Sequence, residues 1–259
     1  MTTLDRRSAL GVLLGAAVPP YAHATAIVLD VRTRRVVEVH REDLAREWLL
    51  PPGSTIKPLA LMALIESGKM RVDERFPCPG KLVIGGRSFA CSHPRVGVPI
   101  EIATALAYSC NCFVTHFAQR FEAGELARYL RRDGLVEVQS ADDVDARQLQ
   151  AIGEARVLVT PMQLVTVYAR LAAQAKGPIL DGLEAAVDYG TAQLAALPHI
   201  KVAGKTGTVL TSGGARVAWF AGFAPARAPQ VAIVTAVQGR SGGLDAAPMA
   251  GRILGERLR

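Results

Sequence analysis

The sequence predicts an α/β fold in which a five-stranded antiparallel sheet carries helices on both faces, together with a helical subdomain. Three observations support this: two short apolar or alternating runs near the start, three more near the end, and helical patterns between and after them. The 259 residues are 50% hydrophobic and 20% charged, which supplies enough apolar material for one well-filled core.

The first two strands are expected at residues 25–30 and 35–39, where apolar or alternating runs flank a polar turn typical of a hairpin. The chain that follows is expected to be a loop. A helix is then expected at residues 59–67, because the run is apolar and Gly68 is a typical helix stop.

The middle third is rich in helical patterns. Residues 100–108 follow Pro99 and predict one helix, and residues 112–121 predict a second. A third helix is predicted to begin at Thr160 and Pro161, because threonine is a good N-cap and proline fits the first helical position.

The last third changes from helical patterns to strands. Residues 200–208, 215–223 and 230–237 are apolar or alternating runs, separated by polar or Gly/Pro-rich turns. Residues 245–259 return to a helical pattern. With the first hairpin, these runs give the five strands of the predicted sheet and a terminal helix to cover it.

Residues 1–24 have the features of a signal peptide: Arg6 and Arg7, an apolar run at residues 8–18, and a small-x-small end. The apolar run is shorter than the ~20 residues that a membrane helix needs. The paired arginines also resemble a twin-arginine export signal. We therefore expect an exported protein whose folded domain covers residues 25–259.

The basic residues argue against a nucleic-acid partner. The formal net charge is +7, but the lysines and arginines are spread along the chain instead of forming one block. Nucleic-acid-binding arms and patches show such blocks, so no nucleic-acid partner is expected. A basic exported protein is instead attracted to an anionic cell envelope.

Two of the four cysteines bracket a predicted hairpin. Cys78 and Cys91 flank residues 81–90, which read as two short strands around a Gly-Gly turn. Hairpin pairing brings its two ends together, and exported proteins form disulfides. A Cys78–Cys91 disulfide is therefore predicted.

The other two cysteines are not expected to pair, because Cys110 and Cys112 are two positions apart and point to opposite sides in either a helix or a strand. Four side chains offer zinc ligands: Cys78, Cys91, His93 and Cys110. Their spacings match no common zinc-ligand pattern, so neither a metal nor another cofactor is expected.

The first chemical motif is Ser54-x-x-Lys57, at the predicted start of a helix. Backbone N–H groups and the helix dipole favour an anion there. A lysine three residues on lies on the same face, and beside other cations it can be neutral enough to activate a serine. Pro58 fits a first helical turn. Taken alone, the motif is also compatible with a solvated helix start.

The second motif is Ser109-x-Asn111. In an extended or turned segment, the hydroxyl and the amide can both face a cleft. The hydroxyl could then relay a proton while the amide holds a substrate carbonyl. The same residues are equally compatible with a joint between two helices, where they would serve as capping groups.

The third motif is Lys205-Thr206-Gly207-Thr208, on a predicted strand. Strand alternation puts the two threonines on one face, and the glycine lets a substrate backbone approach closely. A cation with hydroxyl groups suits a substrate carboxylate. The alternative is a solvated edge strand.

In combination, S-x-x-K, S-x-N and K-T-G occur in that order at separations of tens of residues, and the chain resembles penicillin-binding proteins and serine β-lactamases. The wider context resembles the penicillin-binding transpeptidase domain over nearly everything after residue 25. The segments that carry this resemblance are 51–58, 78–80, 105–111, 160–164, 202–208, 219–225 and 246–248. The resemblance is to a stand-alone form, without the membrane anchor, pedestal or glycosyltransferase domain of larger members.

The resemblance implies roles for the first two motifs. Ser54 attacks a D-Ala-D-Ala carbonyl or a β-lactam ring, and Lys57 takes its proton. Ser109 helps to pass this proton to the leaving amine, and Asn111 positions Lys57 and the substrate amide. The resemblance also implies a location on the periplasmic or cell-envelope side of the inner membrane, without naming partners in cell-wall synthesis.

The resemblance implies that the third motif binds the substrate carboxylate. Lys205, Thr206, Gly207 and Thr208 would receive it, and the backbone N–H groups of Ser54 and Thr208 would form the oxyanion hole. The implied ligands are peptidoglycan stem peptides and β-lactams. The implied activity is that of a D,D-transpeptidase or D,D-carboxypeptidase that forms an acyl-enzyme.

Two alternatives stay open. A class D-like β-lactamase shares S-T-x-K, K-T-G and the 219–222 motif, but such enzymes carry an apolar residue where this chain has Asn111, and residues 160–164 also favour the transpeptidase. The second alternative is a non-catalytic sensor of β-lactams or wall peptides. The nearest acidic candidates for a hydrolytic base are Glu154 and Asp245. The resemblance implies a structural role at the position of Glu154, so slow deacylation is expected.

Overall fold

The computed structural model describes residues 23–91, 93–94 and 97–258. Most of the predicted signal segment, residues 1–22, lies outside this part of the chain. The first strand begins at Ala24, where that segment was predicted to end. Within the described residues, no helix combines the length and the apolar character needed to cross a bilayer.

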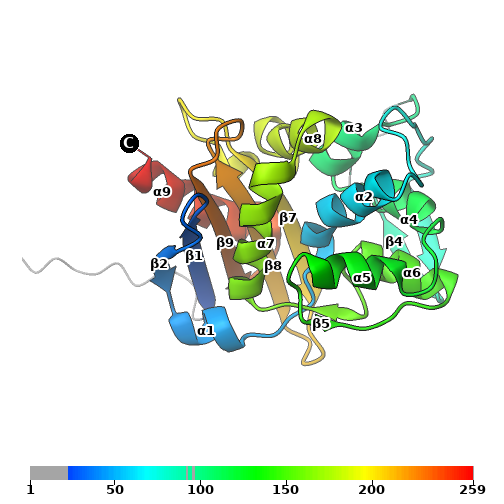
Figure 1. Cartoon of the computed structure of the whole chain (residues 1–259), viewed down its shortest axis with the longest axis horizontal. Helices are drawn as coiled ribbons and strands as arrows, with labels where there is room; N and C mark the ends of the chain where they lie inside the picture. Colours follow the sequence, from blue (N-terminus) through cyan, green and yellow to red (C-terminus); the bar gives the residue numbers. More distant parts are fainter. Residues whose placement is uncertain (1–22, 92, 95–96, 259) are drawn as a thin grey trace, which may run out of the picture.

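A five-stranded sheet forms the centre of the fold, in the order β2-β1-β9-β8-β7 (Figure 1). Every neighbouring pair is antiparallel, as predicted. Its strands are β1 (Ala24–Asp30), β2 (Val36–His40), β7 (Ala203–Leu210), β8 (Arg216–Ala224) and β9 (Val231–Gln238). The first strand, β1, thus pairs with the last strand, β9. Segments far apart in the sequence therefore lie side by side in one sheet.

Both faces of the sheet are covered, because alternate residues of a strand point to opposite sides. In β8, Trp219 and Phe223 belong to the larger core, where they pack with residues of α7. Phe220, between them, belongs to a second core that includes residues of α9. Figure 1 shows α7 crossing in front of the sheet. The prediction of helices on both faces is confirmed.

The described residues contain nine α-helices and three shorter helical turns. The α-helices are α1 (Glu42–Glu47), α2 (Lys57–Glu66), α3 (Ile102–Ala107), α4 (Asn111–Ala118), α5 (Glu125–Arg132), α6 (Val144–Ala151), α7 (Pro161–Gln174), α8 (Gly177–Asp188) and α9 (Ala247–Arg257). The shorter turns are η1 (Gly53–Ile56), η2 (Gln193–Ala195) and η3 (Gly242–Ala246).

The helical subdomain contains α2 to α6 and lies beside the sheet, on the side of β7 (Figure 1). Two small antiparallel pairs belong to it. These are β3 (Lys81–Ile84) with β4 (Arg87–Ala90), and β5 (Glu137–Val138) with β6 (Val157–Leu158). The β3–β4 pair is the hairpin expected between the first two cysteines. Its turn residues, Gly85 and Gly86, both have positive φ, as a tight Gly-Gly turn requires.

Local sequence signals explain several boundaries. The predicted start of α7 is confirmed: Thr160 caps the helix, and its side chain and that of Gln163 form a reciprocal capping box. The expected loop before Ser54 contains a short helix, α1. No helix was assigned to the α8 segment, which begins with Gly177 and carries Gly182 in its interior, both poor helix formers.

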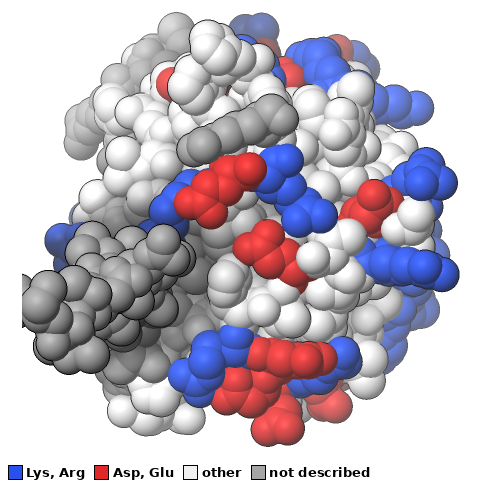
Figure 2. Space-filling model, turned by 90° about the vertical axis from the view of Figure 1, so that its left-hand side faces the viewer, with Lys and Arg blue, Asp and Glu red and all other residues white. Residues whose placement is uncertain are grey.

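On the face at one end of the molecule, acidic and basic side chains are interspersed (Figure 2). Near α1, for example, Arg41 pairs with Asp43 and Arg46 pairs with Glu42. Such mixed charge does not make a continuous basic surface.

Candidate active site

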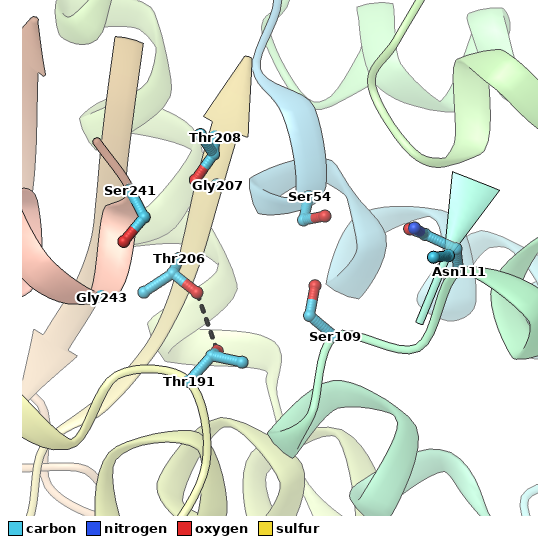
Figure 3. Close-up of a pocket in the computed structure, with 10 residues that line it drawn as sticks. Ser54, Ser109, Asn111, Thr191, Thr206, Gly207, Thr208, Ser241 and Gly243 are labelled. Carbon is cyan, nitrogen blue, oxygen red and sulfur yellow. Dashed lines mark hydrogen bonds between the residues drawn. The ribbon is translucent and has the colours of Figure 1, made fainter. Parts of the chain in front are cut away.

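The three sequence motifs meet at one cavity of about 300 Å³. It lies between η1, the end of β7 and the segment that leads into α4 (Figure 3). Its lining residues are Ser54, Ala90, Ser109, Asn111, Thr191, Thr206, Gly207, Thr208, Ser241 and Gly243. Residues from all three motifs therefore face one space, although each motif alone was compatible with a structural role.

Ser54 lies in η1, a short 3-10 turn that continues into α2. Two buried aromatic side chains hold this turn by donating hydrogen bonds to one backbone carbonyl just before it and one within it. The indole Nε1 of Trp219 donates to Pro51 O at 3.1 Å, and the hydroxyl of Tyr168 donates to Thr55 O at 2.7 Å. Ser54 is thus fixed from the sheet on one side and from α7 on the other.

The Ser54 hydroxyl faces the cavity, and the Ser109 hydroxyl points toward Ser54 (Figure 3). Ser109 has φ +57°, the left-handed region that a non-glycine residue rarely adopts. Such strain persists only where surrounding contacts enforce it, and it is concentrated at functional sites. Asn111 follows as the first residue of α4.

Lys57 joins the first two motifs. Its Nζ donates to Ser109 O at 2.7 Å, to Ser109 Oγ at 3.2 Å and to Asn111 Oδ1 at 2.6 Å. The side chain is completely buried, and this desolvation lowers the pKa of Lys57 to about 8. At pH 7, about a tenth of such an amine is neutral, far more than for a solvated lysine.

The cause of this pKa differs from the one expected. Proximity to other cations was expected to make the lysine neutral, but burial is the main cause that lowers the pKa of Lys57. Negative charge on the neighbouring cysteine sulfurs and on Glu154 acts in the opposite direction and raises the pKa. A neighbouring cation lowers the pKa of Lys205 instead. Burial and the nearby charge of Lys57 together hold the pKa of Lys205 well below its usual value.

The third motif occupies β7, where alternation places its side chains as predicted. Thr206 and Thr208 both line the cavity. The Lys205 side chain is fully buried, does not line the cavity and donates to Thr206 O at 3.1 Å. A contact between a substrate carboxylate and either Lys205 or the two threonines therefore stays a prediction.

Gly207 has a structural reason to lack a side chain. A Cβ built at Gly207 would lie 2.9 Å from Pro52 O and 3.2 Å from Thr55 Cγ2. Both atoms belong to residues that flank Ser54. The glycine therefore lets β7 and η1 approach closely, which sets the width of the cavity. From the sequence, glycine was expected at this position to let the substrate backbone approach closely.

Four lining residues were missed by the sequence analysis: Ala90, Thr191, Ser241 and Gly243. Thr206 Oγ1 donates to Thr191 Oγ1 at 2.7 Å (Figure 3). Ser241 begins a turn whose Gly242 N donates to Thr208 Oγ1 at 3.1 Å. The glycine-rich run around Ser241 could have indicated a tight turn near the sheet, but no local signal marks Thr191.

Among the described residues, no acidic or histidine side chain lines this cavity. Glu154 is paired with Arg87 at 2.7 Å. Asp245 accepts hydrogen bonds from Arg240 N at 2.6 Å and Ser241 N at 3.0 Å, so it shapes the turn before α9. The two acidic candidates noted in the sequence thus have structural partners.

The predicted disulfide is wrong for this structure. Cys78 Sγ and Cys91 Sγ lie 3.8 Å apart, and all four cysteines are free. Cys110 and Cys112 are not bridged to each other in this structure. The reason given for that expectation is wrong, because the two side chains do not point to opposite sides: both contact Cys91 Sγ, at 3.7 Å and 3.5 Å. Cys110 has extended backbone angles as the N-cap of α4, so the pair follows neither helical nor strand alternation.

A serine, a buried lysine and a second serine held with an asparagine define a site of the kind that forms acyl-enzymes. Residues 24–255 match the family model described as the penicillin binding protein transpeptidase domain, and the chain belongs to this family. A stretch of 58 residues is 47% identical to penicillin-binding protein 1A/1B of Bacillus subtilis, covering 18% of this chain and 6% of that protein.

A longer similarity, 25% identity over 274 residues, is to the peptidoglycan D,D-transpeptidase PbpA of Mycobacterium tuberculosis. It covers 81% of this chain but only 55% of PbpA, so the chain spans about half the length of this relative.

Solved structures show the same fold. The TP domain of Burkholderia pseudomallei penicillin-binding protein 3 matches with a TM-score of 0.81 and 20% identity, over 92% of this chain and 88% of that one. The transpeptidase domain of Legionella pneumophila FtsI4 D,D-transpeptidase matches with a TM-score of 0.70 and 24% identity, over 91% and 89%.

Proposed function

We propose that this chain is a penicillin-binding D,D-transpeptidase or D,D-carboxypeptidase that acts on peptidoglycan stem peptides through an acyl-enzyme at Ser54. The observation that carries the proposal is the position of Lys57, whose buried amine is bonded to Ser109 and Asn111 beside the Ser54 cavity. Family membership and the naming of PbpA as a peptidoglycan D,D-transpeptidase also support it.

The first step is attack by Ser54 Oγ on a D-Ala-D-Ala carbonyl or on a β-lactam ring. Neutral Lys57 takes the hydroxyl proton, and its contact with Ser109 Oγ gives that proton a path to the leaving amine. Because Asn111 Oδ1 accepts from Lys57, the amide nitrogen of Asn111 is left to donate to the substrate. The bond to the leaving amine breaks and an ester to Ser54 remains.

The opposite wall of the cavity would bind the rest of the substrate. The hydroxyls of Thr206 and Thr208 would receive the terminal carboxylate, with Lys205 behind them, where its Nζ donates to Thr206 O. The backbone N–H groups of Ser54 and Thr208 would form the oxyanion hole. The closeness of η1 to β7 supports this, since a Cβ at Gly53 would lie 3.6 Å from Thr208 N.

Hydrolysis of the ester should be slow. It requires a base aimed at a water molecule, and the described residues that line the cavity offer no carboxylate and no imidazole. Each missing 1.4 kcal/mol of barrier stabilisation costs about tenfold in rate. This favours a penicillin-inhibited enzyme. A class D-like β-lactamase would instead hold a carbamate on the lysine in an apolar pocket, and the contacts of Lys57 Nζ with Ser109 O and Asn111 Oδ1 argue against that arrangement. A sensor that stays acylated is the other alternative, and turnover of a wall peptide distinguishes it.

We further propose that the protein is exported and works on the envelope side of the inner membrane. The sequence of residues 1–24, with paired arginines and a short apolar run, supports an export signal. The domain that follows, residues 25–259, would meet its wall substrate there.

Acylation by penicillin tests the proposal. Intact-mass spectrometry should show one adduct per chain, absent from Ser54→Ala and present in the control Ser67→Ala at the end of α2, outside the cavity. An adduct that persists in Ser54→Ala would refute the assignment. A fluorescent penicillin should remain bound for many minutes, and nitrocefin turnover above roughly one per second, a typical enzyme rate, would identify a β-lactamase instead. Release or transfer of D-Ala from a D-Ala-D-Ala peptide would exclude a sensor.

A further inference from the structure

The four cysteines form a cluster next to the cavity, and the acyl-transfer mechanism uses none of them. They come from the two ends of the β3–β4 hairpin and from the start of α4. We propose that the thiolates of Cys78, Cys91 and Cys110, together with the Nε2 atom of His93, bind one zinc ion. The spacing along the sequence gave no reason to expect a metal, because only the fold brings these segments together.

The sulfur positions fit zinc geometry. The Sγ atoms of Cys78, Cys91 and Cys110 form a triangle with sides of 3.8, 3.7 and 3.5 Å. Sulfur atoms bound to one zinc at ~2.3 Å in a regular tetrahedron lie ~3.8 Å apart. A disulfide would instead need about 2.05 Å between two of these atoms. The triangle therefore has the dimensions of one face of a zinc–thiolate tetrahedron.

His93 supplies the fourth corner. Its Nε2 is buried and has no hydrogen-bond partner among the described residues, whereas its Nδ1 lies 2.8 Å from Pro94 O. When Nδ1 donates to that carbonyl, Nε2 carries the free lone pair, which is the arrangement typical of a zinc-binding histidine. The four ligand atoms all lie within 4.8 Å of one another.

Backbone contacts favour the thiolate form of two of the ligands. Gly80 N donates to Cys78 Sγ at 3.3 Å, and Phe113 N donates to Cys110 Sγ at 3.4 Å. Such bonds stabilise and orient metal-bound sulfur. Soft thiolates with one imidazole in tetrahedral geometry select zinc over harder cations. On binding, each of the three thiols releases its proton to solvent.

The position of Cys110 gives the ion a role in the active site. This residue lies between Ser109 and Asn111, the two residues that accept from Lys57. A zinc ion would tie this segment to the hairpin that carries Ala90, another lining residue of the cavity. The ion would therefore position Ser109 and Asn111 without touching the substrate.

Metal analysis of the full chain tests the site. Protein purified under reducing conditions from zinc-supplemented cells should contain about one zinc per chain. Cys78→Ser and Cys110→Ser should fall to background. Cys112→Ser is the matched control, because Cys112 contacts Cys91 Sγ but is outside the mutually close set of four, and it should keep its zinc. His93→Gln should weaken zinc binding at least tenfold in competition with a chelator.

Cobalt substitution of the unmutated protein covers the case in which the serine variants do not fold. The cobalt-loaded chain should show the intense visible absorption of tetrahedral thiolate coordination, lost on chelation and restored by reloading. Wild-type protein without bound metal, or Cys78→Ser with a full zinc complement, would overturn the proposal. Loss of zinc in Cys112→Ser with retention in His93→Gln would overturn the ligand assignment.

The positioning role has a separate readout that rests on the proposed function. Removing zinc from the wild-type chain should slow penicillin acylation of Ser54 about tenfold, as expected for misplaced catalytic groups. Reloading should restore the rate. Acylation that is unchanged after zinc removal would overturn the positioning role. The metal content is measured independently of acylation, so failure of one proposal is distinguishable from failure of the other.

Discussion

Adding one methyl group at Gly207 tests whether the close approach of β7 to η1 holds Ser54 in position. In Gly207→Ala, the new Cβ would lie 2.9 Å from Pro52 O, 3.2 Å from Thr55 Cγ2 and 3.4 Å from Trp219 Cβ. Ordinary contacts begin near 3.4 Å, so the Pro52 carbonyl must move by about 0.5 Å. The backbone of η1 cannot make this movement without carrying Ser54 with it.

The size of the effect follows from that displacement. Overpacking a close contact typically costs about 1–3 kcal/mol of stability. A 1 Å misplacement of reacting groups can cost about 100-fold in rate, so a shift of half that size should slow acylation roughly tenfold. The expected result is a folded protein, less stable by about 1–3 kcal/mol, that still forms the Ser54 adduct but forms it more slowly.

Two measurements check this: the second-order rate of labelling by a fluorescent penicillin, and the free energy of unfolding in urea. Gly213→Ala is the matched control, because its Cβ would meet only Thr211 Oγ1, at 3.9 Å. It should acylate normally and be at least as stable, since alanine reduces the entropy of the unfolded chain by an amount worth about 0.4–1 kcal/mol. A wild-type acylation rate and stability in Gly207→Ala would refute the reasoning.

Two further predictions concern Lys57 and Tyr168. Burial lowers the pKa of Lys57 to about 8 and only the neutral amine is a base, so the acylation rate should rise with pH and reach half its maximum near pH 8. A rate that is flat between about pH 6.5 and 9 would contradict this. Tyr168→Phe removes the donor to Thr55 O and leaves a buried carbonyl without that partner, which should cost about 1–3 kcal/mol in urea unfolding. An unchanged unfolding free energy would show that the carbonyl finds another partner.

The sheet could be predicted from the sequence because its strands carry their signals locally. Apolar runs bounded by turns mark β7, β8 and β9, and Thr160 with Pro161 marks the start of α7. The α8 segment has no such signal. Its Gly182 instead lets the helix pack closely against α3, since a Cβ there would lie 2.9 Å from Ala103 Cα. The helix is therefore stabilised by a tertiary contact that its own residues do not reveal.

In the site, likewise, the motif residues could be recognised from the local sequence, whereas their partners could not. Three short motifs indicated Ser54, Lys57 and the β7 residues, because their order and local structure were jointly informative. The partners of those residues come from elsewhere in the fold, as Thr191 does for Thr206. The cysteines show this most clearly: pairing within one hairpin suggested a disulfide, and only the fold brings Cys110 to 3.5 Å from Cys78.

Burial and hydrogen bonding act on Lys57 in opposite directions, and the balance between them explains why the segment around Ser109 matters. Desolvation favours the neutral amine, whereas three acceptor contacts favour the ammonium. A base that must take a proton and later return it needs both forms to be accessible near the working pH. All three acceptors belong to Ser109 and Asn111. Loosening this segment would weaken the acceptors that hold the amine in place, and a zinc ion on Cys110 would keep it where the proton transfer requires it.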